Sequence, residues 1–242
     1  MSIRLWKVTG ITQEFTKNKT MTCDKNPEKI TKMFDEISSY YDNMNNFISL
    51  GTHYLIKKTA LKNLKIGANS YVLDLCCGTG DFTRILGQIA PKSKVIGLDN
   101  SKEMLKLAKT KNPQKAFMQG DCTALPFGEN EFDYITVGFG LRNVENRKKA
   151  ISEIYRTLKH GGKFLHLDFG RHGFVDKCFD FIVPLFVKIL GISSENYSYL
   201  LKSKNEYPQP DELIKEFETQ GFRFVRQQDF FFGAISYQIM QK

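Results

Sequence analysis

Tyr71-Val72-Leu73-Asp74-Leu75-Cys76-Cys77-Gly78-Thr79-Gly80-Asp81 is the stretch that decides the fold of this 242-residue chain. Its apolar first half is typical of a strand that is buried on both faces. Glycine follows at 78 and 80, where the backbone can approach a ligand because no Cβ intervenes, and a helical pattern then runs to about residue 90. The stretch predicts an α/β fold with a ligand beyond the carboxyl end of this strand.

The same alternation of strand and helix continues along the chain. Four more short apolar runs predict strands, at 94–99, 117–121, 132–137 and 163–169. Helical spacing follows Ser101, a plausible N-cap, and again fills 146–158 before a stop at Gly161-Gly162. This rhythm predicts a parallel sheet covered by helices on both faces. Near the C-terminus a helix is predicted over 212–219, and the segments 221–226 and 234–239 are expected to pair antiparallel.

Composition sets broad limits on what the chain does. Hydrophobic residues make up 41% and charged residues 25%, which excludes collagen-like, coiled-coil and wholly disordered chains. The net charge of +9 suits nucleic acid, an anionic membrane or acidic ligands, and does not choose among them. No run approaches the roughly 18 apolar residues that a membrane span requires.

Cysteine and histidine usage bears on compartment and metal. The five cysteines are odd in number and none forms a C-x-x-C pair, so a reducing compartment and a cytoplasmic location are predicted. The four histidines lack any H-E-x-x-H spacing, so we expect no metal site.

The domain organisation is read from the same patterns. Residues 1–25 are expected to form a loose N-terminal arm, and 26–242 a single domain. Helices at 26–66 precede the sheet, and 170–207 interrupt the strand–helix rhythm. Both segments are candidates to cover a ligand, with ordinary packing an equal alternative for each.

Three carboxylates fall at neighbouring strand ends. Asp74 lies inside the first strand and needs a partner, such as a ligand's ammonium group, unless it is simply a solvated strand-end residue. Asp99 ends the second strand nineteen residues after Gly80, near the offset at which an acid accepts ribose hydroxyls. Asp121 ends the third strand beside Cys122, where a carboxylate and a backbone amide can recognise an adenine.

An amino-acid end, a ribose and an adenine without phosphates describe S-adenosylmethionine, whose positive sulfonium suits acidic strand ends. A nicotinamide dinucleotide fits less well, because Thr83 stands where the third glycine of its fingerprint would fall. A nucleic-acid methyltransferase would usually carry Asn/Asp-Pro-Pro-aromatic where this chain reads Val137-Gly138-Phe139-Gly140. A non-catalytic module with the same pocket stays open as an alternative.

Several blocks carry a family resemblance. The segment 72–81 resembles motif I of class I S-adenosylmethionine-dependent methyltransferases. Further blocks are similar to the ubiquinone/menaquinone biosynthesis C-methyltransferases: Phe34-Asp35-x-Ile37-Ser38-x-x-Tyr41-Asp42, Ser49-Leu50-Gly51-x-His53, Gly120-Asp121-x-x-x-Leu125-Pro126-Phe127 and Phe139-Gly140-Leu141-Arg142-Asn143-Val144. The likeness runs from about residue 32 to residue 237.

The resemblance implies a Rossmann-like fold with a mostly parallel, seven-stranded sheet and an antiparallel C-terminal strand pair. It also implies methylation of a ring carbon in a polyprenylated quinol, which is demethylmenaquinol, 2-polyprenyl-6-methoxy-1,4-benzoquinol or both. RNA or another small molecule is the alternative substrate. The residues expected to bind S-adenosylmethionine are Asp74, Gly78, Thr79, Gly80, Asp99, Asp121 and Cys122.

The chain departs from the family pattern at several positions. Gly138 stands where serine is usual, and Asp168 where glutamate is usual. The segment Phe230-Phe231-Phe232-Gly233-Ala234-Ile235-Ser236 replaces a Leu-Thr-Gly-Gly block, and its role is left open.

Ring methylation needs an electron-rich ring, which loss of a phenolic proton provides. Arg142 holds its own proton but can stabilise a phenolate, and Asn143 can orient a hydroxyl or a water. Tyr41, or as second choice His53, is expected to relay the proton. The alternative for Arg142 is a structural role in a surface salt bridge. His166 is expected to pack in the core.

A long isoprenoid tail must come from a bilayer, so peripheral contact with the inner membrane face is predicted. One set of apolar residues is predicted to form a channel or docking face for the tail. Their spacing fits the core-facing side of a helix equally well. The residues are Phe179, Phe181, Ile182, Leu185, Phe186 and Ile189. A homodimer or a quinone-biosynthesis complex is a possible assembly, and no nucleic-acid partner is expected.

Overall fold

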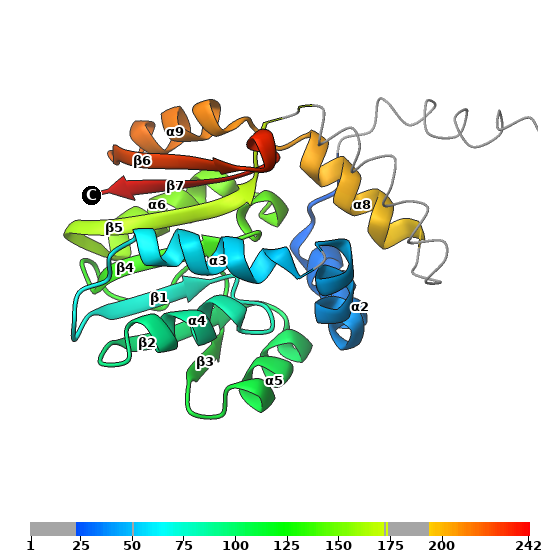
Figure 1. Cartoon of the computed structure of the whole chain (residues 1–242), viewed down its shortest axis with the longest axis horizontal. Coiled ribbons are helices and arrows are strands. Elements are labelled where there is room, and N and C mark those ends of the chain that lie inside the picture. Colours follow the sequence, from blue (N-terminus) through cyan, green and yellow to red (C-terminus); the bar gives the residue numbers. More distant parts are fainter. Residues whose placement is uncertain (1–22, 50, 172, 174–193) are drawn as a thin grey trace, which may run out of the picture.

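The structure is a computed structural model that describes residues 23–49, 51–171, 173 and 194–242. In this part of the chain, seven strands form one sheet in the order β3-β2-β1-β4-β5-β7-β6 (Figure 1). The strands are β1 (Tyr71–Leu75), β2 (Lys94–Asp99), β3 (Ala116–Gln119), β4 (Phe132–Gly138), β5 (Leu158–Phe169), β6 (Arg223–Phe230) and β7 (Ile235–Gln241). Every neighbouring pair is parallel except those of β7, which runs antiparallel to both β5 and β6. The predicted mostly parallel sheet and its antiparallel C-terminal pair are confirmed.

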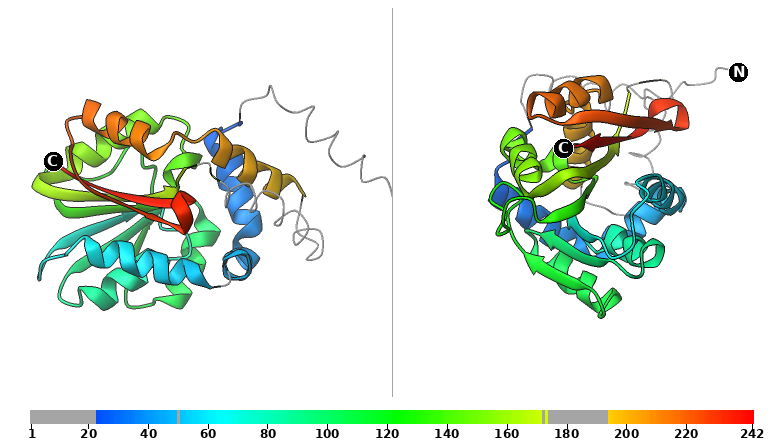
Figure 2. Two further views of the ribbon diagram at one scale, coloured as in Figure 1. Left: turned by 45° about the horizontal axis from the view of Figure 1, so that its top comes forward. Right: turned by 90° about the vertical axis from the view of Figure 1, so that its left-hand side faces the viewer.

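Helices cover both faces of the sheet, as Figures 1 and 2 show. They are α2 (Pro27–Ile48), α3 (Thr52–Asn63), α4 (Asp81–Ile89), α5 (Lys102–Lys111), α6 (Arg147–Thr157), α8 (Ser194–Asn205) and α9 (Pro210–Thr219), with short 3-10 turns η1 (Leu141–Asn143) and η2 (Phe231–Gly233). The predicted N-cap is confirmed, because the Ser101 side chain accepts from the backbone N–H of Met104.

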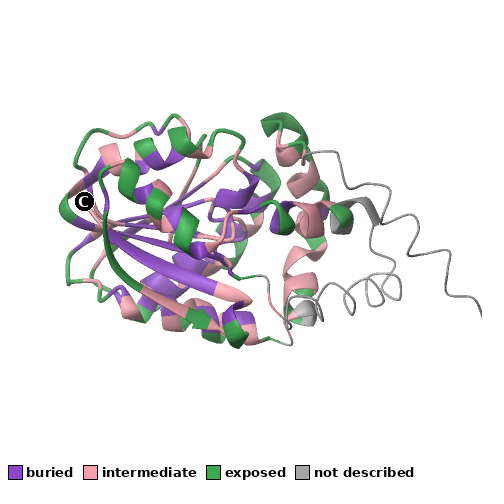
Figure 3. Cartoon of the chain, turned by 90° about the horizontal axis from the view of Figure 1, so that it is seen from above, coloured by how far each residue is buried: buried purple, intermediate pink, exposed green. Residues whose placement is uncertain are grey.

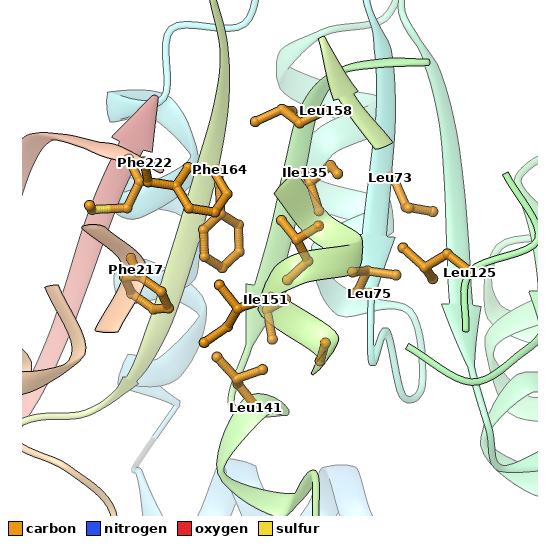
Figure 4. Close-up of a cluster of buried hydrophobic side chains, with 14 of the residues drawn as sticks. Leu73, Leu75, Leu125, Ile135, Leu141, Ile151, Leu158, Phe164, Phe217 and Phe222 are labelled. Carbon is orange, nitrogen blue, oxygen red and sulfur yellow. The ribbon is translucent and has the colours of Figure 1, made fainter. Parts of the chain in front are cut away.

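Strand alternation explains how one sheet holds two cores. Val72 of β1 packs in a cluster with residues of α3 and α4, whereas Leu73 and Leu75 pack with residues of α6 and α9. Figure 4 shows the second cluster, in which Phe164 of β5 meets Phe217 of α9. In Figure 3 the buried residues are concentrated in the strands between the two helical layers.

Two predicted boundaries were wrong for identifiable reasons. The first strand ends at Leu75 rather than residue 77, because Cys76 takes a left-handed backbone conformation with φ of 53°. The predicted stop at Gly161-Gly162 lies inside β5, which begins at Leu158. The glycines sit opposite a register irregularity in β4, so the chain passes directly from α6 into the strand.

The ligand edge follows from the strand order. The chain leaves β1 toward β2 on one side, and β4 lies on the other, so a crevice opens at the carboxyl ends of β1 and β4. The helices α2 and α8 lie past this same end of the sheet, as does η2 (Figures 1 and 2).

Candidate functional site

Two adjoining cavities occupy the carboxyl edge of the sheet, one of about 390 Å³ and one of about 180 Å³. We call them the first and the second cavity. They share part of their walls, namely Tyr41, Cys76, Gly78, Gly138 and Phe139. A ligand longer than either cavity can therefore extend through both.

The second cavity contains the acidic residues predicted for a nucleoside. Asp99, the last residue of β2, accepts from the backbone N–H groups of Gly78 (2.8 Å) and Ser101 (2.9 Å). Burial raises the pKa of its carboxyl group. The backbone thus holds Asp99 rigidly at the wall, with further lone pairs for hydroxyl donors.

Asp121 and Cys122 line the same cavity. The prediction that Asp121 ends the third strand was wrong, because β3 ends at Gln119 and Asp121 lies in the turn that follows. The Asp121 carboxylate accepts from the backbone N–H (2.7 Å) and the hydroxyl (2.8 Å) of Thr123, an arrangement that fixes the turn after β3. A hydrogen bond with the Cys122 thiol, together with burial, raises the pKa of Cys76 well above its ordinary value. The Cys76 thiol is therefore a weakly polar part of the cavity wall rather than a nucleophile.

Asp74 is fully buried and lines the first cavity, so the solvated strand-end alternative is wrong. Its two oxygens accept hydroxyl hydrogen bonds from Thr83 (2.6 Å) and Thr136 (2.9 Å). Burial nevertheless raises its pKa to about 7. Thr83 stands where the dinucleotide fingerprint has its third glycine. Its role here is to donate a hydrogen bond to the buried Asp74 carboxylate.

The two glycines after β1 have different roles. A Cβ on Gly78 would meet none of the described atoms within 4 Å, so its backbone is open to a ligand. Gly80 is absent from the described residues that line either cavity. Its φ is 84°, and a Cβ there would lie 3.0 Å from Phe117 and 3.2 Å from Ala108, so packing demands this glycine.

Thr79 joins the loop after β1 to helix α2. Its hydroxyl donates to the Asp42 carboxylate at 2.7 Å, and Lys111 of α5 pairs with the same carboxylate. A second polar link joins the Asp35 carboxylate of α2 to the Ser101 hydroxyl. These contacts hold α2 across the cavities, where Tyr41 forms part of both walls.

The loop after β4 places Arg142 and Asn143. Gly140 is required there because a Cβ would lie 2.3 Å from the Cys76 Cβ, so the loops after β1 and β4 pack in direct contact. The carbonyl of Phe139 accepts from Arg142 Nη1 (2.6 Å) and from Asn143 Nδ2 (3.4 Å). One carbonyl thereby aligns both predicted side chains.

Arg142 is buried, so the surface salt bridge is wrong as its explanation. Its Nη1 donates to Asp168 Oδ1 at 3.0 Å, and its guanidinium lies 5.1 Å from the ring centroid of Phe169. Among the described residues, Arg142 Nε and Asp168 Oδ2 find no hydrogen-bond partner. Arg142 lines the first cavity, so its guanidinium places a positive charge at this wall.

Asn143 lies on the wall of the second cavity. Its Oδ1 accepts from the hydroxyl of Tyr199 in α8 at 3.0 Å, and burial raises the pKa of that hydroxyl. Leu200, the next residue of α8, lines the first cavity. Helix α8 thus contributes both a polar contact and an apolar wall.

His53 makes a contact that sequence reasoning undervalued. The Ser49 hydroxyl donates to the Asn45 carbonyl (2.6 Å) and is 2.6 Å from His53 Nδ1. Because that hydroxyl has one proton, Nδ1 is the donor in the second contact and Nε2 is left as an acceptor. Burial and the nearby Lys57 lower the pKa of His53, although Asp81 opposes them. A neutral imidazole therefore faces the first cavity with a free lone pair.

Asp81 and Lys57 complete this wall and were missed by sequence reasoning. Lys57 Nζ lies 2.7 Å from Asp81 Oδ2, and His53 Nε2 lies 4.0 Å from the same oxygen. The four-residue spacing from His53 to Lys57 was the available signal, since it puts both on one helix face. His166 is buried between Tyr207 and Gln238, as predicted for a core residue.

Some sequence predictions find no test here. The apolar set between Phe179 and Ile189 lies outside the described residues. Within 23–49, 51–171 and 194–242, no helix has both the length and the apolar character to cross a membrane. No group of three or more His, Cys, Asp or Glu among the described residues is arranged to hold a metal.

A mostly parallel seven-stranded sheet of this order, with an antiparallel C-terminal pair and acidic residues at the carboxyl ends of β1 and β2, is the fold of class I S-adenosylmethionine-dependent methyltransferases. Phosphoethanolamine N-methyltransferase 2 of Haemonchus contortus, solved with S-adenosyl-L-methionine, has this fold, with a TM-score of 0.65, 18% identity and coverage of 86% of this chain and 57% of that one. The ligand in that structure, S-adenosylmethionine, is the co-substrate that the sequence analysis predicted for this chain.

The chain belongs to the ubiE/COQ5 methyltransferase family, whose model matches residues 21–242. It is 39% identical over 220 residues to the demethylmenaquinone methyltransferase of Staphylococcus carnosus, covering 86% of this chain and 91% of that protein. It is 36% identical over 227 residues to the enzyme of the same name from Anoxybacillus flavithermus, covering 89% and 96%. The predicted family is confirmed.

Proposed function

We propose that this chain methylates a ring carbon of demethylmenaquinol, with S-adenosylmethionine as methyl donor. The relatives that share 36–39% of its residues are named for that substrate. The observation that carries the proposal is the buried Arg142 guanidinium, which lies on the wall of the first cavity and is paired through Nη1 with Asp168. A positive guanidinium at a cavity wall is suited to stabilise a phenolate.

The predicted co-substrate residues fit different parts of one ligand. Asp99 is proposed to accept the ribose hydroxyls, and Asp121 with Cys122 to hold the adenine. The amino-acid end is assigned to the wall formed by Asp74, Gly78 and Thr79, while Gly80 supports this wall through packing. When bound, S-adenosylmethionine supplies an electrophilic methyl group on a positive sulfur.

His53 is proposed to take the phenolic proton. Its neutral Nε2 is an acceptor on the wall of the first cavity, and Ser49 fixes its tautomer. A base whose pKa lies near or below neutrality is deprotonated at working pH. Tyr41, at the junction of the two cavities, is the second candidate for this proton transfer.

Arg142 is proposed to stabilise the phenolate with its positive charge, while Asp168, which accepts from Nη1, holds the guanidinium in place. Asn143 is proposed to orient a hydroxyl or a water. Charge disappears when the methyl group reaches the ring, so an apolar wall favours the step over bulk water. That wall includes Phe82, Phe169, Leu200 and Ile235.

The described parts of the predicted covering segments 26–66 and 170–207 are proposed to cover the bound substrates, as parts of one domain predicted over 26–242. Residues 1–22 of the predicted arm at 1–25, and residues 174–193, lie outside the described residues. The contacts of α2 with the loops after β1 and β2, and of α8 with Asn143, support this role. A second copy of the chain or a quinone-biosynthesis complex as partner, and location at the inner membrane face, remain predictions.

A labelled-methyl assay tests the function. The protein is given S-adenosylmethionine with a radioactive methyl group and, in parallel, reduced demethylmenaquinone, the 6-methoxybenzoquinol and RNA. Label in the naphthoquinol ring, placed on carbon by NMR, is the expected result. Label in RNA alone, or in neither quinol, would overturn the proposal, and label in the benzoquinol alone would change the substrate.

A further inference from the structure

The tip between β6 and β7 has a backbone that does not suit its residues. Phe231 and Phe232 of η2 have φ angles of 49° and 55°. This left-handed region favours glycine, asparagine and aspartate, and a bulky side chain is uncommon there. The stability of the turn therefore does not explain two consecutive phenylalanines.

The tip is held firmly while its second ring is exposed. The N–H of Gly170 donates to the Ala234 carbonyl (2.9 Å), and the N–H of Arg171 donates to the Gly233 carbonyl (2.6 Å). These bonds fix η2 to the end of β5. The side chain of Phe232 is nevertheless 97% exposed, more than any other large hydrophobic residue among those described.

The same tip forms part of the first cavity. Phe231 is 48% exposed and lines that cavity together with Ala234 and Ile235. His53 and Arg142 stand on other parts of the wall. On α3, two residues after His53, Leu55 is 69% exposed and adds a second apolar side chain to this end of the molecule. An apolar path therefore continues from the proposed reaction site to the outer surface.

We propose that Phe232 inserts into the surface of a lipid bilayer and that Phe231 guides the substrate's isoprenoid tail between the bilayer and the first cavity. This inference rests on the proposed function, because only a substrate with a long apolar tail needs such a path. A cavity of about 390 Å³ accommodates the ring, whereas a polyprenyl chain must leave it. Exposed aromatic side chains insert at the boundary of headgroups and acyl chains, and the net charge of +9 favours anionic lipid.

Vesicle binding with paired substitutions tests the tip. Phe232→Asn removes the ring and suits the left-handed backbone, so the turn is preserved, whereas Phe232→Trp keeps an aromatic anchor. Phe224→Asn is the matched control, since Phe224 is 40% exposed on β6 and does not line either cavity among the described residues. Binding is measured by sedimentation with vesicles of phosphatidylcholine and phosphatidylglycerol.

Phe232→Asn is expected to weaken vesicle binding about tenfold, while the tryptophan and control variants bind like the wild type. With long-tailed quinol in the vesicles, Phe232→Asn should raise KM by a similar factor. With a tail-less demethylnaphthoquinol in solution, its kcat should equal that of the wild type.

Unchanged vesicle binding of Phe232→Asn, or equal loss in Phe224→Asn, would overturn the docking role. A loss of turnover on the vesicle substrate without a loss of vesicle binding would also overturn it. Failure of the wild type to methylate either the long-tailed or the tail-less quinol would instead contradict the proposed function, so the two failures are distinguishable.

Discussion

Arg142 donates through Nη1 to Asp168 Oδ1 at 3.0 Å in a buried pair that keeps two further atoms, Arg142 Nε and Asp168 Oδ2, without partners among the described residues. Charged groups that leave water in this way need compensation, and a pair that retains an unused donor and acceptor is incompletely compensated. Asp168 does not line either cavity in the described part of the chain, so we expect it to affect the proposed reaction only by orienting Arg142.

Asp168→Asn should lower the free energy of unfolding by about 3 kcal/mol, because it removes one partner of a buried ion pair. It should also lower kcat by at least about tenfold while the Kd of S-adenosylmethionine stays unchanged. Asp168→Glu keeps the charge and should recover most of kcat. Glu103→Gln, which breaks an exposed pair with Lys106, should leave both quantities nearly unchanged. Equal loss of kcat in both asparagine and glutamate variants would contradict an orienting role for the charge.

The pH profile of kcat/KM should report His53. Burial and Lys57 hold the pKa of this imidazole below its ordinary value of 6.5. A base is active when deprotonated, so activity should rise with pH through that pKa and be level above about pH 7. His53→Gln should remove this rise and lower the plateau by about 10²–10⁴-fold. A rise that persists unchanged in His53→Gln would contradict the assignment of His53 as the proton acceptor.

S-adenosylmethionine binding should depend on pH through Asp74. Its pKa is raised to about 7, and a cationic ligand favours the ionised carboxylate. Affinity should therefore rise about tenfold from pH 6 to pH 8, with release of a proton on binding. Titration calorimetry in buffers of different ionisation enthalpy measures both. Asp74→Asn should abolish this rise of affinity with pH. Asp99→Asn should weaken S-adenosylmethionine binding at every pH but leave the pH dependence in place. A pH-independent Kd in the wild type would place the ligand's positive end elsewhere.

Packing between the loops after β1 and β4 should be sensitive to a single methyl group. Gly140→Ala should cost about 1–3 kcal/mol, because the new Cβ would lie 2.3 Å from that of Cys76. Cys76→Gly removes the collision and suits the left-handed backbone at that position, so the double variant should recover most of the stability. Gly128→Ala, where the nearest atom is 3.6 Å away, is the control. Denaturant titration that shows no recovery in the double variant would contradict this account.

The sequence predicted the sheet because each strand carries its own pattern. Alternation and turn residues located β1, β2 and β4, and the last residue of β2 was correctly placed as the carboxylate beside Gly78. Strand boundaries were predicted wrongly where the backbone takes a conformation that is unusual for the residue type. Cys76, a left-handed cysteine, is such a case.

Contacts between residues that are far apart in the chain could not be predicted from the sequence. Parallel register places Asp74 directly beside Thr136, 62 residues away, and so determines which hydroxyl satisfies the buried carboxylate. The partnership of Arg142 with Asp168 arises in the same way, from the ends of neighbouring strands. For Gly80, the glycine spacing suggested a ligand contact, whereas the packing of Phe117 explains the residue.

The most direct test of the proposed mechanism compares chemistry and co-substrate binding in Arg142 variants. Single-turnover rates with reduced demethylmenaquinone and the Kd of S-adenosylmethionine are measured for wild type, Arg142→Lys and Arg142→Gln. A donor that stabilises developing negative charge contributes about 10²–10³-fold, so Arg142→Gln should lose that much rate with its Kd within about twofold of wild type. Arg142→Lys should lose less, because it keeps a positive charge. A rate that falls only in proportion to S-adenosylmethionine affinity, or does not fall, would contradict the assignment of Arg142 to the quinol.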